Sequence, residues 1–209
     1  MAKNSGEPLS TGSRMTPQRL QTLVDGIFAI AMTLLVFNFK APEGGLSAAD
    51  FSRRVLDLWP QFWTFGQSFL LLGIFWASSN RQSRFIQFTD QGHLWINILW
   101  LMFVALVPFS TSLLARYAPY PTCALFFHAN LLLIGVLFDW NWRHARNRGL
   151  LYQNTSVGII RGMGRRNLVF PATSLCAIGL SFATPLWSSL AYLLIPFLLR
   201  LLTRKPAEP

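Results

Sequence analysis

The stretch RLQTLVDGIFAIAMTLLVF, residues 19–37, decides the fold of this chain. It is an apolar segment of helical length that begins with Arg19 and holds one carboxylate, Asp25. An Asp at the centre of a bilayer costs roughly 2.5 to 3.5 kcal/mol, and less toward the ends. A carboxylate at this place is therefore a functional-site hypothesis, provided that the rest of the chain supports a membrane helix.

The composition supports one. Of the 209 residues, 52% are apolar and only 12% are charged, and the charges cluster between long empty stretches. Residues 58–80, 94–115 and 117–138 carry no charge, and each is long enough for the roughly 20 residues that span the hydrocarbon core. Residues 167–199 would form a helix of about 50 Å at about 1.5 Å per residue, too long for one crossing. We therefore fold them into a hairpin that turns at 181–185.

These segments predict an all-α integral membrane protein with six transmembrane helices, in a channel or transporter domain over residues 16–202. Residues 1–15 and 203–209 are expected to be a disordered N-terminus and a short tail. A short amphipathic turn is expected at 48–56, and a basic loop at 143–165. The expected helices are 16–39, 58–80, 91–114, 121–142, 166–182 and 185–202.

The basic residues orient this topology. One side collects fourteen: Lys3, Arg14, Arg19, Arg81, Arg84, Arg143, Arg146, Arg148, Arg161, Arg165, Arg166, Arg200, Arg204 and Lys205. The other side collects four: Lys40, Arg53, Arg54 and Arg116. We predict a multi-pass protein of the cell membrane with both termini cytoplasmic. The net charge of +10 then reflects contact with anionic lipid at the cytoplasmic face, and nucleic acid is not an expected partner.

The first helix carries the candidate site. Four of its residues recur at i, i+3, i+4 and i+7 and form one stripe: Ile30, Thr33, Leu34 and Phe37. Periodicity alone leaves two interpretations open, packing against neighbouring helices or lining of a conduction path. If the helix lines a path, several chains must surround an axis, because one copy cannot enclose a pore.

Asp25 also has two interpretations, a proton or cation site and a structural anchor for the first helix. We favour the anchor, because buried acids in membranes usually pair or accept hydrogen bonds. Its expected partners are Trp76, Asn80 and Asn97. Arg19 lies about 240° around the helix from Asp25, so the two side chains cannot pair along it.

No enzymatic motif is present: the chain has no HExxH, no GxSxG, no glycine-rich phosphate loop and no acidic cluster. No cofactor is expected. The three histidines lack metal-ligand spacing and are interpreted as hydrogen-bonded polar residues. A secondary transporter is the alternative function, since Pro108, Pro171 and Pro196 could break helices at mid-membrane, although no internal repeat supports it.

Arg19, its spacing to Asp25 and the following GIFAIAMTLLV resemble the first-helix signature of prokaryotic members of the transmembrane protein 175 family, the endosomal and lysosomal potassium channels. QSFLLLGIFW (67–76), the Asn80–Arg81 end of the second helix and HLWINILWLMFVALVPFSTSLL (93–114) resemble the family's next two helices. The similarity extends over about residues 17–116. In two places the chain departs from the family: Leu23 and Val24 stand where Phe-Ser is usual, and Ser79 stands where a His is common.

The resemblance implies a homotetramer with four copies of the first helix around a pore that conducts K+. It implies that Ile30 forms a narrow hydrophobic gate, that Thr33 shapes a modest selectivity for K+ over Na+, and that Leu34 and Phe37 form further apolar layers. The structural motif that it implies comprises Arg19, Asp25, Gly26, Trp76 and Asn80.

Overall fold

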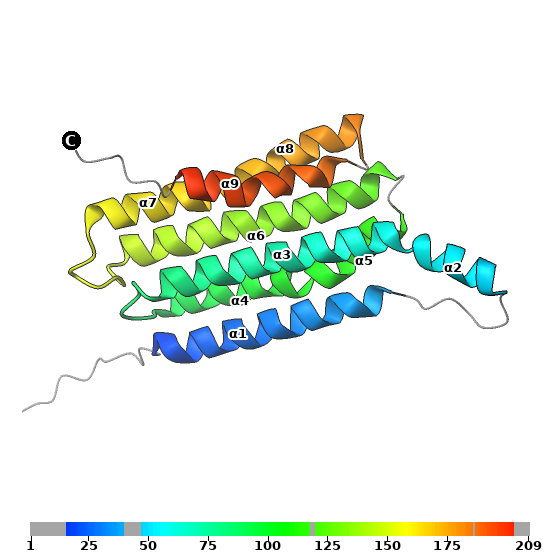
Figure 1. Cartoon of the computed structure of the whole chain (residues 1–209). Coiled ribbons are helices and arrows are strands. Elements are labelled where there is room, and N and C mark those ends of the chain that lie inside the picture. Colours follow the sequence, from blue (N-terminus) through cyan, green and yellow to red (C-terminus); the bar gives the residue numbers. More distant parts are fainter. Residues whose placement is uncertain (1–15, 40–46, 118–119, 186, 203–209) are drawn as a thin grey trace, which may run out of the picture.

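The computed structural model describes residues 16–39, 47–117, 120–185 and 187–202. Over these residues the chain is an elongated bundle of roughly parallel and antiparallel helices (Figure 1). The all-α prediction is confirmed. The terminal segments predicted as 1–15 and 203–209 lie outside the described residues. The helical elements, in chain order, are α1 (Pro17–Leu34), η1 (Leu35–Asn38), α2 (Ala48–Leu56), α3 (Trp59–Ser83), α4 (Gln91–Ala105), α5 (Val107–Arg116), α6 (Pro121–Asn147), α7 (Val157–Asn167), α8 (Val169–Ala183), η2 (Ser188–Leu193) and α9 (Leu194–Leu201).

By length and composition, three of these helical segments can cross a membrane: Pro17–Asn38, Gln91–Arg116 and Pro121–Asn147. Helix α3 is 25 residues long but less apolar. Several of its polar side chains are buried in the bundle, where Ser68 accepts a hydrogen bond from Thr111 at 2.9 Å and Gln67 donates to the Ser189 carbonyl. Part of its polarity is therefore used in contacts within the bundle, whereas Arg81 near its end is exposed.

Three prolines explain where the later helices break. A proline has no amide hydrogen to donate to the carbonyl four residues earlier, so an α-helix ends or kinks before it. Pro108 and Pro171 follow the breaks between α4 and α5 and between α7 and α8, and Pro196 follows the change from the 3-10 helix η2 to α9. The three prolines therefore mark two helix breaks and one change of helix type.

One prediction about the second half of the chain needs correction. The basic loop predicted at 143–165 is largely helical, because α6 continues to Asn147 and α7 begins at Val157, where Ser156 caps the helix by accepting a hydrogen bond from Ile159. The hairpin turn begins after Ala183, within the predicted 181–185. By contrast, the amphipathic turn predicted at 48–56 is the helix α2, capped by Ser47.

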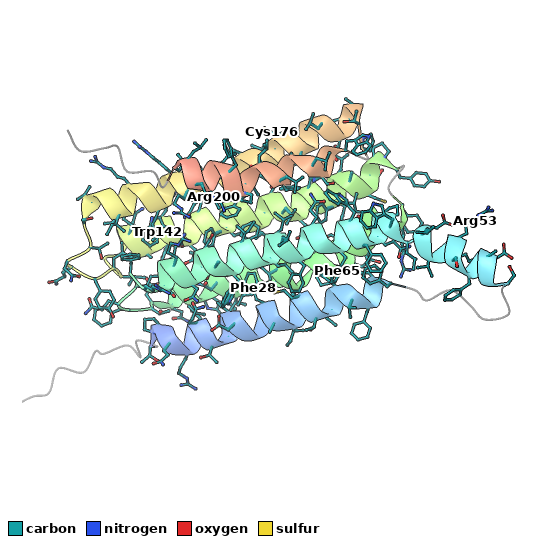
Figure 2. The ribbon with its side chains drawn as sticks, in the orientation of Figure 1. Phe28, Arg53, Phe65, Trp142, Cys176 and Arg200 are labelled. Atoms are coloured by element: carbon teal, nitrogen blue, oxygen red, sulfur yellow. The ribbon has the colours of Figure 1, made fainter. Side chains whose placement is uncertain are left out.

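A chain of aromatic rings forms the centre of the bundle. Phe28 of α1 contacts Trp100 of α4 with ring centroids 5.4 Å apart, and Trp100 stacks on Phe138 of α6 at 5.5 Å. Phe75 of α3 and Phe170 of α8 complete the cluster at 4.3 Å from each other. Figure 2 labels Phe28, which is 1% exposed. One contiguous core therefore joins five helices.

Helices α6 and α8 approach especially closely at Gly135. A Cβ atom at this position would lie 2.9 Å from the Pro171 backbone nitrogen and 3.0 Å from the Phe170 Cβ. Only glycine fits this distance without displacing backbone. This contact holds α8 against α6, and α1 lies across the bundle against α3 and α4 (Figure 1).

Candidate functional site

Helix α1 has one buried face and one uncovered face. The buried face consists of Leu20, Val24, Phe28 and Ala31, and Leu35 of η1 continues it. The stripe predicted from the sequence lies on the uncovered face, where Ile30 is 56% exposed and Phe37, in η1, is 75% exposed. Thr33 and Leu34 are exposed beside them. The structure thus brings the four residues together on a surface that the single chain leaves open.

The Thr33 hydroxyl is oriented by its own helix. Its Oγ1 donates to the carbonyl oxygens of Ile30 at 2.9 Å and of Ala29 at 3.1 Å. Because the hydrogen is used within the helix, the lone pairs of the oxygen remain as acceptors on the uncovered face. A neutral oxygen in this state can replace part of the hydration shell of a cation.

The uncovered face extends further toward the N-terminus than the predicted stripe. Leu23, 45% exposed, lies seven residues before Ile30, and a Cβ atom at Gly26 would have no neighbour within 4 Å. Both positions follow the same periodicity, seven and four residues before Ile30. Extending the stripe backward through the sequence would have found them.

Asp25 is exposed beside this stripe, and its carboxylate accepts hydrogen bonds from α3 and from its own helix. The indole nitrogen of Trp76 donates to Asp25 Oδ1 at 2.8 Å, and the amide of Gln21 donates to the same oxygen at 2.9 Å. Trp76 was one of three expected partners. Among the described residues, Asn80 and Asn97 make no hydrogen bond with Asp25, and Asn97 instead donates to the His93 carbonyl at 2.8 Å. Arg19 is exposed and, as expected, does not pair with Asp25.

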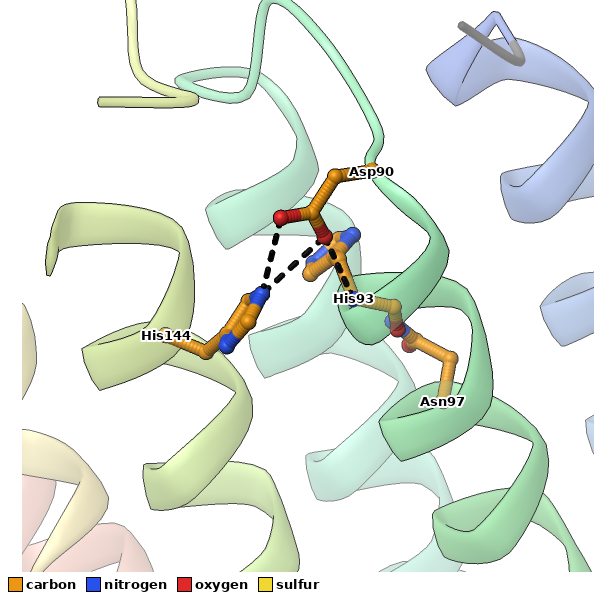
Figure 3. A network of polar contacts seen from close by, with 4 residues as sticks. All are labelled: Asp90, His93, Asn97 and His144. Carbon is orange, nitrogen blue, oxygen red and sulfur yellow. Dashed lines mark hydrogen bonds and ion pairs between the residues drawn. The ribbon is translucent and has the colours of Figure 1, made fainter. Parts of the chain in front are cut away.

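A second polar network, which was not predicted from the sequence, joins the N-terminal end of α4 to α6 (Figure 3). Asp90 caps α4 by accepting a hydrogen bond from the His93 amide at 2.6 Å. The same carboxylate accepts from His144 Nε2 of α6 at 3.0 and 3.1 Å. Gly92 makes room for this contact, because a Cβ there would lie 2.8 Å from the His144 ring. Asp90 therefore joins α4 to α6.

Burial of Asp90 raises the pKa of its carboxyl, but the hydrogen bonds from the His93 amide and from His144 outweigh it, so the pKa lies below the ordinary 3.8.

The other two histidines differ from each other in their hydrogen bonds. His128 bonds Tyr192 at 3.0 Å and Ser188 at 2.8 Å, as expected of a satisfied polar residue. The same expectation is wrong for His93, whose buried ring nitrogens have no partner among the described residues.

Over the described ranges, no three His, Cys, Asp or Glu side chains come together as metal ligands. The site is therefore a face of mostly apolar side chains with one hydroxyl, next to a carboxylate that holds the helix in place. Such a surface has no nucleophile and no acid–base pair. It can exclude or admit ions, which requires no covalent chemistry.

Comparison with known proteins gave consistent matches. Residues 19–108 match the family model "Endosomal/lysosomal potassium channel TMEM175". A potassium channel of Chamaesiphon minutus is 32% identical over 176 residues, which cover 82% of this chain and 86% of that protein. A potassium channel of Streptomyces collinus is 31% identical over 143 residues, 64% of this chain and 66% of that protein.

Solved structures match as well. The crystal structure of a lysosomal potassium-selective channel TMEM175 homolog from Chamaesiphon minutus superposes with a TM-score of 0.77 and 28% identity, over 90% of this chain and 98% of that one. A variant of the potassium channel MtTMEM175, crystallised in complex with a Nanobody-MBP fusion protein, shares the fold at a TM-score of 0.59 and 18% identity, over 95% of this chain and 94% of that one.

The Asp25–Trp76 hydrogen bond predicts a measurable coupling. Replacing Trp76 with Phe removes the donor and should lower the free energy of unfolding in detergent by about 1 kcal/mol, the size of a strong interhelical hydrogen bond in a membrane protein. Asp25→Asn should lower it too, and the double variant should lose less than the sum. Trp63→Phe, at an exposed tryptophan of the same helix, serves as the control. Additive losses would contradict the contact.

The lowered pKa of Asp90 predicts a pH dependence of stability. Because the folded chain keeps this carboxylate charged to a lower pH than the unfolded chain does, its stabilisation is fully present above pH 3.8 and is lost as pH falls through the folded pKa. Asp90→Asn keeps the cap but removes the charge, so the difference in Tm between wild type and variant should shrink on acidification below about pH 4. Asp57→Asn, an exposed position at the end of α2, should show no such trend. A constant difference for Asp90→Asn would refute the assignment.

Proposed function

Because the chain belongs to the TMEM175 family of potassium channels, we propose that it conducts K+ passively across the cell membrane through a pore lined by α1. The family is one of ion channels and not of enzymes. The uncovered face of α1 carries this proposal. It presents a row of apolar side chains that includes one hydroxyl group, that of Thr33, which is oriented by its own helix. The family match begins at Arg19, near the start of α1, and continues to Pro108.

The proposed topology has six crossings. The start of α1 and the end of α9 lie at the same end of the bundle, which fits an even number (Figure 1). We assign to this end most of the arginines of the described segments: Arg19, Arg81, Arg84, Arg143, Arg146, Arg148, Arg161, Arg165, Arg166 and Arg200. By the positive-inside rule this end is cytoplasmic, and anionic lipids are its proposed partners.

The proposed assembly is a homotetramer. A single chain contributes one α1, and one helix cannot enclose a path for an ion. Four copies arranged around an axis would each turn the uncovered face inward. Contact with lipid would also leave an apolar face uncovered in one chain, and substitutions on this face separate the two arrangements.

Ile30 is the proposed gate. A ring of isoleucine side chains makes a narrow apolar neck, and such a neck empties of water and blocks ions until it widens or is wetted. Ile30 is suited to this role because it is 56% exposed and its β-branched side chain prefers one χ1 rotamer in a helix. Leu34 and Phe37 would continue the apolar lining toward the outer end.

Thr33 is the proposed selectivity residue. Four neutral hydroxyl oxygens, each with its hydrogen donated to its own helix, would offer a ring of acceptors to a partly dehydrated cation. Neutral dipoles offset only part of the dehydration cost, which is larger for Na+ than for K+. The proposed selectivity for K+ is therefore modest.

Replacing Ile30 with Asn should make the pore leakier, because a polar ring stays hydrated. The measurement is K+ flux into proteoliposomes followed with a membrane-potential dye, with at least a severalfold rise expected. Leu175→Asn, at a position of α8 that is also exposed, is the matched control and should leave the flux unchanged. If Ile30→Asn and Leu175→Asn changed the K+ flux equally, the uncovered face of α1 would contact lipid and would not line the pore. Slow, saturating wild-type flux would indicate a transporter.

Replacing Thr33 with Ala should lower the permeability ratio of K+ to Na+ without abolishing flux, because the hydroxyl ring is lost while the neck remains. The ratio is read from reversal potentials under opposing K+ and Na+ gradients. Thr33→Ser keeps the oxygen and should preserve the ratio. An unchanged ratio in Thr33→Ala would remove this residue from the conduction path.

A further inference from the structure

A basic hollow lies between α3 and α7, away from α1. It is shallow, with a volume of about 10 Å³ for a water-sized group, and it opens to the surface. Its polar lining includes Ser78, Arg81, Arg166 and Asn167. Its apolar lining consists of Met163, Phe170 and Leu199.

One hydrogen bond assembles this hollow. The Gln82 amide of α3 donates to Asn167 Oδ1 of α7 at 2.7 Å, and both side chains are buried. Each partner has an arginine directly before it in the chain, Arg81 and Arg166. The bond between the two amides therefore brings two guanidinium groups to the rim of the same hollow.

In the part of the chain that the structure describes, the Asn167 amide of this hollow lacks an acceptor, and its two arginines lack a carboxylate partner. Asn167 is 3% exposed, and its Nδ2 has no hydrogen-bond partner among the described residues. No carboxylate of the described residues forms an ion pair with Arg81 or Arg166. The Arg166 guanidinium is half-buried and is repelled by the charge of Arg81. Two like charges and a buried amide hydrogen without an acceptor are an unfavourable arrangement unless an anion joins them.

The surroundings place the hollow at the level of lipid headgroups. Helix α7 is amphipathic, with Arg161 and Arg165 exposed and with Val157 and Ile159 also exposed, as in helices that lie in the membrane interface. The apolar helix α8 begins only two residues after Asn167. The polar rim and the apolar wall of the hollow therefore meet at the boundary between water and hydrocarbon.

We propose that Arg81, Arg166 and the Asn167 amide bind a phosphate group, carried by an anionic phospholipid headgroup or free in the cytoplasm. A phosphate oxygen would accept from Asn167 Nδ2 and the guanidinium groups would hold the remaining oxygens, as arginine forks do with phosphate. The cytoplasmic assignment of this end rests on the proposed function, whereas the binding chemistry does not.

The test uses the purified full-length protein in detergent, with retained lipid counted by native mass spectrometry. Dioleoyl phosphatidic acid is the probe, and dioleoyl phosphatidylcholine is the comparison lipid. Wild type should retain phosphatidic acid preferentially, and Arg81→Gln and Arg166→Gln should each lower that retention roughly tenfold, as expected when a charge-assisted hydrogen-bonding group is lost. Arg165→Gln, the same charge change at the exposed neighbouring position, should have no effect.

An excess of inorganic phosphate distinguishes the two sources. Displacement of the lipid by phosphate would identify the free ion as a ligand, and failure to displace it would identify the headgroup with its chain. Equal losses in Arg165→Gln and Arg166→Gln would overturn the site, because diffuse surface charge would then explain the binding. Loss in none of the variants would overturn it as well. Thermal unfolding confirms that each variant is folded, and Arg81→Lys, which keeps the charge but not the fork, should show partial loss.

Potassium flux is measured on the same preparations. Absence of wild-type flux together with arginine-dependent lipid retention would refute the channel and leave the phosphate site standing. Normal K+ flux together with lipid retention that does not depend on Arg81 or Arg166 would support the channel and refute the phosphate site.

Discussion

The packing of the inner face of α1 against α3 and α4 is the constraint on which the candidate site depends. Both faces of α1 are apolar, so hydropathy does not decide which one turns inward. Within a bilayer, transfer from lipid to a protein interior gains little, and helix association depends on close packing and hydrogen bonds. The Phe28–Trp100 contact supplies close packing, and aromatic pairs of this kind contribute about 0.5 to 1.5 kcal/mol to stability. The Asp25–Trp76 contact supplies the hydrogen bond.

The remaining helices support this packing from behind. Trp100 is held by Phe138 of α6, and α6 is held by the close approach of α8 at Gly135. The Asp90 carboxylate fastens α4 to α6 at the N-terminal end of α4. A glycine and a carboxylate therefore contribute to the packing behind α4, against which α1 lies.

Much of the fold and part of the site followed from the sequence. The helices could be placed because charges mark their ends and prolines mark their breaks. The stripe at Ile30 followed from helical periodicity, and Trp76 was among the named partners of Asp25 because an indole donor suits a carboxylate. The uncovered position of the stripe is a structural finding, whereas its role in conduction stays a proposal.

The misses share a physical cause. The sequence indicates a loop in place of helix α7 because the arginines and glycines of this segment lower its hydropathy, while its cap at Ser156 gives only a short signal. The Asp90–His144 contact joins residues 54 positions apart, and no local pattern links them. His93 was expected to be satisfied, but whether a buried ring finds a partner depends on the packing of several helices at once. Contacts of this kind require the tertiary structure.

Helix α1 and the short η1 that follows it are held to the subunit at three successive points: Asp25 to Trp76, Phe28 to Trp100, and Asn38 to the Pro108 carbonyl at 3.2 Å. Axial rotation of the helix would break all three contacts together, whereas a tilt about Phe28 would leave the middle one in place. Ile30 is about 3 Å along the axis from that pivot, so tilting would move it least. In the proposed pore, a tilt of α1 would therefore displace the neck less than either mouth.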